Sequence, residues 1–243
     1  MQRIRLRYTK RGRLRFTSHR DIARVFERAL RRAEVPMAYS AGFSPHPKVS
    51  WVGAAATGVG SEAEYVEIAL AEVRDVEQIR AALDASLPDG IDLVEAVEAV
   101  SGTSLADLVQ ASNWRIELRD VPLAALESAV HAFLARDLVE VERMTKNGRR
   151  VFDARQPVVF MSATAGDDCA ILSLVVQHVT PAVRPDDVLT GLRSVSDLAT
   201  PVPPAATRLA QGPLTETGEV GDPLAPIHQV GATRQDAEAA GAS

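Results

Sequence analysis

The sequence predicts an α+β protein made of two ferredoxin-like sandwiches with antiparallel sheets, followed by a disordered C-terminal tail. Apolar residues recur at strand and helix spacings along residues 1–103, and the same mixture recurs along residues 112–200. Residues 201–243 lose this periodicity and are rich in Pro, Gly and Ala. Because the chain has 243 residues, 46% of them hydrophobic, it is long enough to bury more than one core. These three ranges are therefore the predicted domains and tail.

The first predicted element is a β-hairpin with one cationic face. Ile4, Leu6 and Tyr8 alternate with arginines, the turn falls at residues 10–12, and the return strand covers residues 14–16. Since successive side chains of a strand point to opposite faces, one face is apolar and the other carries the arginines. The predicted cationic face consists of Arg3, Arg5, Arg7, Arg13 and Arg15.

A helix is predicted over residues 19–33. Ser18 and Asp21 form a capping box, which satisfies free backbone N–H groups at a helix start. Apolar residues such as Ile22, Phe26 and Leu30 follow at helical spacing and predict the buried side. The opposite side carries Arg20, Arg24, Arg28 and Arg31.

Residues 39–48 predict a stiff, ordered loop. Pro45 and Pro47 fix the backbone on either side of His46, so the imidazole is held on a preorganised backbone. Phe43 and Trp51 are available to stack on a nucleobase, and Lys48 is available to contact a phosphate. The loop is a candidate binding site, and a purely structural loop and a catalytic loop stay open as alternatives.

The remaining predicted elements complete the two domains. The first domain continues with strands at 49–55 and 64–70, a helix at 76–87 and a strand from residue 91. The second domain has a strand at 114–119, a helix starting at Pro122, strands at 138–144, 158–163 and 169–177, a turn at Asn147-Gly148, and a helix at 185–195.

The net charge of −5 conceals two regions of opposite charge. Residues 1–50 hold 13 Lys and Arg against 3 Asp and Glu, which gives +10, so the remaining residues carry −15. A cluster of this size can hold a polyanion even in an acidic protein. The composition therefore places anion binding in the N-terminal region.

Several chemistries are not indicated. The single cysteine, Cys169, excludes an internal disulfide, a C-x-x-C pair and an iron–sulfur cluster held by this chain alone. The histidines show no metal-ligand spacing, and residues 58–63, which fit G-x-G-x-x-A, are followed by strand periodicity and not by a helix. No apolar run reaches the roughly 18 residues of a membrane span. We expect a cytoplasmic protein without metal, cofactor or membrane contact.

The N-terminal motifs resemble those of a known family. The residues that carry the resemblance are the runs Leu14-Arg15-Phe16-Thr17-Ser18-His19-Arg20-Asp21, Phe26-Glu27-Arg28-Ala29-Leu30-Arg31-Arg32-Ala33 and Gly42-Phe43-Ser44-Pro45-His46-Pro47-Lys48. Over about residues 1 to 70 the chain closely resembles the radical SAM-linked protein family of unknown function, which occurs free-standing or joined to B12-binding-type radical SAM proteins. Arg20 departs from the Leu that is frequent there. The resemblance implies a partnership with a separate radical SAM enzyme, because this chain lacks a C-x-x-x-C-x-x-C motif.

Three functions follow from these observations as hypotheses. The favoured one is a non-catalytic RNA-binding or accessory module working with a separate radical SAM enzyme. Its predicted RNA or anion contacts are Arg5, Arg7, Arg13, Arg15, Arg20, Arg24, Arg28, Arg31, Phe43, His46 and Lys48. The alternatives are a metal-independent acid/base enzyme that uses His19 and His46 on a phosphate-containing substrate, and a protein–protein adaptor.

Overall fold

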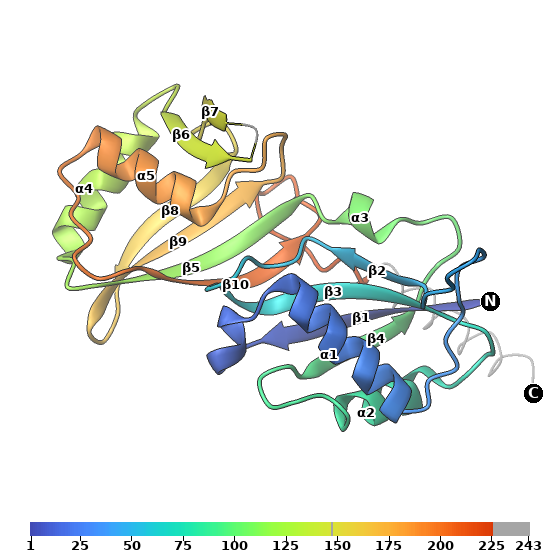
Figure 1. Cartoon of the computed structure of the whole chain (residues 1–243). Coiled ribbons are helices and arrows are strands. Elements are labelled where there is room, and N and C mark those ends of the chain that lie inside the picture. The colour runs from blue at the N-terminus through green and yellow to red at the C-terminus, as the bar shows by residue number, and fades with distance from the viewer. Residues whose placement is uncertain (147, 226–243) are drawn as a thin grey trace, which may run out of the picture. The chain divides into compact units, whose positions relative to one another are not determined.

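A computed structural model describes residues 1–146 and 148–225 of the chain (Figure 1). The chain divides into two compact units. The first contains Met1–Val109 and also the chain from Gly221 onward, and the second contains Gln110–Val220. Both units mix helices with mostly antiparallel strands, so the fold class is α+β.

The first unit has a four-stranded antiparallel sheet in the order β4-β1-β3-β2. Its elements in chain order are β1 (Gln2–Lys10), the 3₁₀ helix η1 (Gly12–Phe16), α1 (His19–Arg32), β2 (Val49–Val52), β3 (Gly60–Leu70), α2 (Val76–Asp84), β4 (Leu93–Glu98) and α3 (Leu105–Leu108). In register, Leu6 of β1 lies opposite Val66 of β3 and Ala96 of β4. Both sides of β1 are therefore occupied by other strands.

The helices α1 and α2 pack on the apolar face of this sheet. Ile4, Leu6 and Tyr8 are buried on that face and share one core with Phe26 of α1 and Leu83 of α2. The alternation of apolar and polar residues along β1 creates this face, as the sequence predicts. Burying such side chains stabilises a fold by about 1.5–3 kcal/mol each.

The predicted return strand at residues 14–16 is wrong. Gly12 has φ +55° and starts η1, where Leu14 N–H donates to the carbonyl of Arg11 at 3.1 Å. A strand at this position has no vacant side of β1 to pair with, because β3 and β4 hydrogen-bond to both sides. The alternation in residues 13–16 is thus too short to decide between a strand and a tight helical turn.

The second unit repeats the same strand order with one insertion. Its elements are β5 (Ala111–Arg119), α4 (Leu123–Leu134), β6 (Glu140–Thr145), β7 (Gly148–Asp153), β8 (Val158–Ala165), β9 (Cys169–Gln177), α5 (Pro185–Val195) and β10 (Ala205–Gly212). The sheet runs β10-β5-β9-β8, and β6 and β7 form a separate two-stranded hairpin. The turn of that hairpin was predicted at Asn147-Gly148, of which Asn147 lies outside the described residues.

The predicted disordered tail begins too early. Residues 205–212 form β10, in which Ala206 lies opposite Ile116 of β5, and Leu214 bridges to Val220. Leu224 is fully buried within the first unit. The small residues of β10 give a weak strand pattern in the sequence, and only pairing with β5 makes this segment a strand. Residues 226–243 of the predicted tail lie outside the described residues.

No helix in the described ranges combines the length and the apolar character that a membrane crossing requires.

Candidate nucleic-acid interface

The helix α1 carries a continuous row of exposed arginines. Ser18 caps the helix, because its Oγ accepts from the Asp21 N–H at 3.3 Å and donates to the Asp21 carboxylate at 2.7 Å. Ile22, Phe26, Ala29 and Leu30 face the core, so the polar side faces solvent. We call the exposed basic residues of this side the arginine surface, and they are Arg20, Arg24, Arg28, Arg31 and Arg32. The sequence predicted the first four as contacts and missed Arg32.

Most of the charge on the arginine surface is not neutralised. Arg24 lies 3.4 Å from Asp21 and Arg31 lies 3.8 Å from Glu27, both at solvent-exposed sites. Ion pairs of this kind contribute about 0–1 kcal/mol. Within the described part of the chain, Arg20, Arg28 and Arg32 make no ion pair. Guanidinium groups spaced one helical turn apart can donate paired hydrogen bonds to successive phosphates.

The arginines of β1 do not join this surface. Arg5 is fully buried, donates from Nε to Glu67 at 3.0 Å and from Nη2 to the Thr103 carbonyl at 2.7 Å. Arg7 pairs with Glu95 at 3.4 Å, and Arg3 pairs with Glu67 at 3.6 Å. These side chains lie on the face of the sheet opposite to α1, because the apolar residues between them face α1. The predicted phosphate role of Arg5 is thereby excluded by burial, and its role is structural.

The arginines of η1 are divided between packing and solvent. Arg15 is half-buried, donates from Nε to the Gly58 carbonyl at 2.9 Å, and lies with its guanidinium 5.1 Å from the ring centre of Phe16. Arg13 is exposed and has no ion pair among the described residues. Of the two, only Arg13 is fully available to an anion.

The loop after α1 is ordered by its own hydrogen bonds, as predicted. The Ser40 N–H donates to the His46 carbonyl at 2.9 Å, and the Ser40 Oγ lies 3.0 Å from Nδ1 of His46. The Lys48 N–H donates to the Ala38 carbonyl at 2.8 Å. At the tip, Gly42 adopts φ +132°, a backbone conformation that other residues rarely reach, and Phe43 is fully exposed. The hydrogen bonds at the two ends of the loop therefore hold Phe43 in place with its ring facing solvent.

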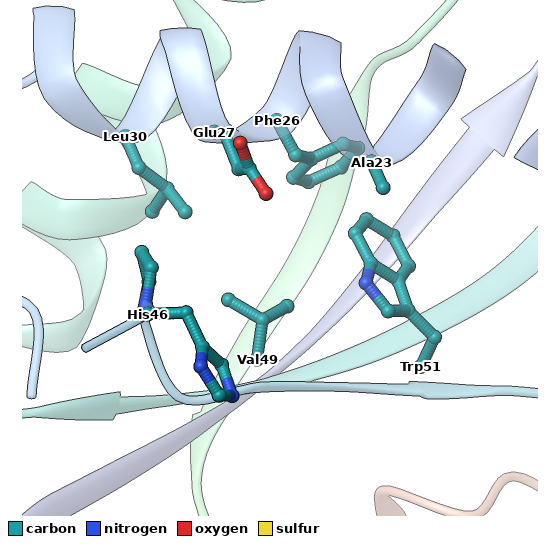
Figure 2. Close-up of a pocket in the computed structure, with 8 residues that line it drawn as sticks. Ala23, Phe26, Glu27, Leu30, His46, Val49 and Trp51 are labelled. Carbon is teal, nitrogen blue, oxygen red and sulfur yellow. The ribbon is translucent and has the colours of Figure 1, made fainter. Parts of the chain in front are cut away.

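A pocket of about 160 Å³ lies between α1 and β2, with the loop at one end. Ala23, Phe26, Glu27 and Leu30 line it from α1, and Val49 and Trp51 line it from β2 (Figure 2). The helix residues recur at i, i+3, i+4 and i+7 and so form one stripe, and the two strand residues are two apart and so share one face. His46 and Pro47 complete the lining.

Aromatic rings close the other end of the pocket. The Phe26 and Trp51 ring centres are 5.1 Å apart in an edge-to-face arrangement, and Tyr8 packs against both. His19 contacts Trp51 edge-to-face at 5.2 Å. The carboxylate of Glu27 points from α1 toward the space between the helix and β2 (Figure 2). Sequence reasoning missed Glu27, because a lone acid within an arginine-rich helix looks like an ordinary surface ion-pair partner.

The two histidines of the catalytic alternative have separate neighbours. His19 begins α1 and contacts Trp51, whereas the Nδ1 of His46 lies against the Ser40 hydroxyl. Over residues 1–146 and 148–225, no hydrogen bond joins the two imidazoles, and no three His, Cys, Asp or Glu side chains gather as a metal-binding group.

Comparison with known proteins identifies the family and little else. The search of curated proteins found no match. Among solved structures, an unknown protein from Galdieria sulphuraria is 14% identical with a TM-score of 0.25, covering 85% of this chain and 98% of its own. A putative dyp-type peroxidase from Shewanella oneidensis is 10% identical with a TM-score of 0.22, covering 81% and 84%.

Such low TM-scores carry no argument about fold or function. The family model, in contrast, matches residues 3–185, which include every element from β1 to the start of α5. The chain therefore belongs to the family described as "Uncharacterized protein conserved in bacteria (DUF2344)".

Proposed function

We propose that this protein is a non-catalytic module that binds RNA through the arginine surface of α1. The observation that carries the proposal is the exposure of five arginines on one helix, three of them without an ion pair in the described part of the chain. A helix places residues four apart about 6 Å from each other, which gives a regular row of cations. Such a row suits a phosphate backbone better than it suits a single small anion.

Two further features support a nucleic acid over an acidic protein surface. Phe43 is fully exposed on an ordered loop and Phe16 is 65% exposed, and exposed aromatic rings offer stacking platforms for unpaired bases. The strand and helix order of both units, βαββαβ apart from the inserted β6–β7 hairpin, supports a ferredoxin-like assignment for each. That architecture is frequent among RNA-binding modules, which is support by analogy only.

The test is RNA binding measured by fluorescence anisotropy with labelled tRNA and rRNA fragments between about 50 and 200 mM salt. If each of Arg20, Arg24, Arg28 and Arg31 meets one phosphate, changing all four to Ala should lower the salt slope by about 3. The matched control changes four exposed arginines of the second unit, Arg115, Arg119, Arg136 and Arg150, to Ala. Equal losses in the two variants would contradict a localised site, and no RNA binding at low salt would favour the protein adaptor.

We also propose, from the resemblance in the sequence, that the bound RNA is presented to a separate radical SAM enzyme. The support within the chain is that it has one cysteine, Cys169, and so lacks the three cysteines of a C-x-x-x-C-x-x-C motif, which a separate enzyme would have to supply. The expected result is that RNA modification by such an enzyme is stimulated by the wild-type protein and not by the α1 arginine variant. Equal stimulation by both proteins would contradict the proposal.

A further inference from the structure

We infer that the pocket between α1 and β2 holds one unstacked cytosine base of the RNA whose backbone lies on the arginine surface. The inference rests on the proposed function and names the base that the site recognises. It is built from the size of the pocket, from its two polar edges and from the position of its rim.

The size of the pocket favours a single-ring base. Its volume is about 160 Å³. An apolar protein cavity of about 150 Å³ is filled by one benzene molecule. A pyrimidine therefore fits, whereas a purine would leave its second ring outside.

The walls of the pocket are those of a base-binding site. Phe26, Leu30, Val49 and Trp51 supply apolar and aromatic surface on both sides of the space (Figure 2). Transferring the faces of an aromatic base from water to such walls is favourable and independent of sequence. Discrimination between bases must then come from the polar groups.

Besides His46, whose Nδ1 lies 3.0 Å from the Ser40 hydroxyl, two side chains of the lining offer polar groups that have no hydrogen-bond partner among the described residues, one an acceptor and one a donor. The Glu27 carboxylate only accepts, and its one ion pair in the described chain, to Arg31, is at 3.8 Å, beyond hydrogen-bond distance. The indole nitrogen of Trp51 only donates, and Figure 2 shows it on the side of the ring that faces Val49. The described residues include no hydrogen-bond acceptor for this indole N–H.

Cytosine matches this pair of groups. Its exocyclic amino group donates to a carboxylate, and its ring nitrogen and carbonyl accept from an N–H group. Uracil offers one N–H between two carbonyl oxygens, and these oxygens would lie against the negative carboxylate. The pocket therefore favours cytosine over uracil by charge and over purines by size.

The rim of the pocket connects the base to the arginine surface. At 3.6 residues per turn, Arg20 and Arg31 are the members of the arginine surface that lie beside Glu27 on the circumference of α1. The 3.8 Å separation of Arg31 and Glu27 shows this proximity directly. A nucleotide with its base in the pocket thus has guanidinium groups next to its phosphate.

The experiment compares the affinity of labelled cytidylate, uridylate and adenylate decamers for the full chain at one salt concentration. We expect the cytidylate decamer to bind roughly tenfold more tightly than the other two, the usual effect of one good base contact. Glu27→Gln should bring the ratio of cytidylate to uridylate affinity close to one, because a glutamine amide both donates and accepts. Glu27 is exposed at the pocket edge, so this variant keeps the core intact.

The matched control is Glu34→Gln, which removes the same charge just beyond the end of α1 and outside the pocket. It should leave the preference for cytidylate unchanged. Equal, salt-dependent binding of all three decamers would overturn the cytosine pocket and leave the proposed function standing. Tighter binding of adenylate would overturn the size argument. Absence of binding by any decamer at low salt, while tRNA and rRNA fragments still bind, would overturn the cytosine pocket, and absence of binding by the tRNA and rRNA fragments as well would overturn the proposed function.

Discussion

At the scale of single residues, the arginines of the N-terminal region divide into structural and exposed groups. Arg5 is buried between Glu67 and Thr103, whereas Arg20 and Arg28 face solvent. A buried guanidinium remains charged, so removing either the guanidinium or one of its partners leaves a desolvated polar group without a hydrogen bond and destabilises the fold. The sequence shows only alternation with apolar residues and cannot distinguish the two groups.

We predict that Arg5→Ala lowers the free energy of unfolding by about 3–5 kcal/mol, because it removes a fully buried guanidinium and leaves the partly buried Glu67 carboxylate and the Thr103 carbonyl without their donor. Arg3→Ala is the matched control, since Arg3 pairs with the same Glu67 from a side chain that is 55% exposed. Its effect should stay below about 1 kcal/mol. Urea unfolding followed by circular dichroism measures both, and equal effects would contradict the division.

Asp187 provides a test of pH dependence. Its carboxylate accepts from the Arg184 N–H at 2.8 Å and from Arg143 at 2.7 Å, yet burial raises the pKa of this carboxyl above its ordinary value of 3.8. A raised pKa in the folded state means that the protonated form is favoured by folding. The contribution of Asp187 to stability is then fullest below pH 3.8 and is lost as the pH rises through the folded-state pKa.

We therefore predict that the stability of the wild-type protein relative to D187N falls as the pH rises from below 3.8 toward neutrality. Urea midpoints of the two proteins across this pH range measure the difference, in which the other titrating groups largely cancel. If the stability of the wild type relative to D187N instead rises with pH, the charge of Arg143 outweighs burial and lowers the pKa of Asp187.

At the scale of elements, α1 is the element that the sequence predicts best. Its cap, its apolar stripe and its arginine row are all local patterns, and a helix of 14 residues with these features starts at His19 as predicted. The pocket beside it is not local, because it needs β2 to lie across from α1. Glu27 becomes a candidate contact only when Trp51, far along the chain, faces it.

We predict that Ser18→Ala destabilises the protein by about 1 kcal/mol, because the Asp21 N–H loses the side-chain acceptor of the cap and the Asp21 carboxylate loses the hydroxyl donor, while the Ser18 carbonyl remains an acceptor for the Asp21 N–H at 3.1 Å. Ser18→Thr keeps a hydroxyl at the cap and should retain most of the stability. Thermal unfolding of the two variants beside the wild type tests this, and equal losses would show that the cap hydroxyl contributes nothing.

At the scale of the whole molecule, the chain leaves the first unit at Val109 and returns to it at Gly221. Leu224 then packs with Ala63, Tyr65, Val97 and Leu105 of that unit. Sequence periodicity cannot reveal such a return, because five residues carry no pattern. A segment predicted as disordered thus supplies part of a core.

We predict that Leu224→Ala costs about 2–5 kcal/mol of unfolding free energy, the usual range for a leucine removed from a core. Leu209→Ala, at a site that is 42% exposed, is the control and should change stability by less than about 1 kcal/mol. Urea unfolding of both variants checks the prediction. A neutral Leu224→Ala would mean that the returning segment is not needed for the first unit.

Spacing along the chain was enough to predict the α+β class, the helices α1, α2, α4 and α5, the strands of both units other than β10, and the cationic character of the first 50 residues. These depend on spacings within one element, which side-chain geometry imposes locally. Four features appeared only in the folded chain: residues 14–16 form a 3₁₀ turn, residues 205–212 form a strand, Arg5 is buried, and Glu27 and Trp51 line one pocket. Each of these depends on which distant segment occupies the neighbouring position, and a short segment adopts whatever structure that neighbour permits.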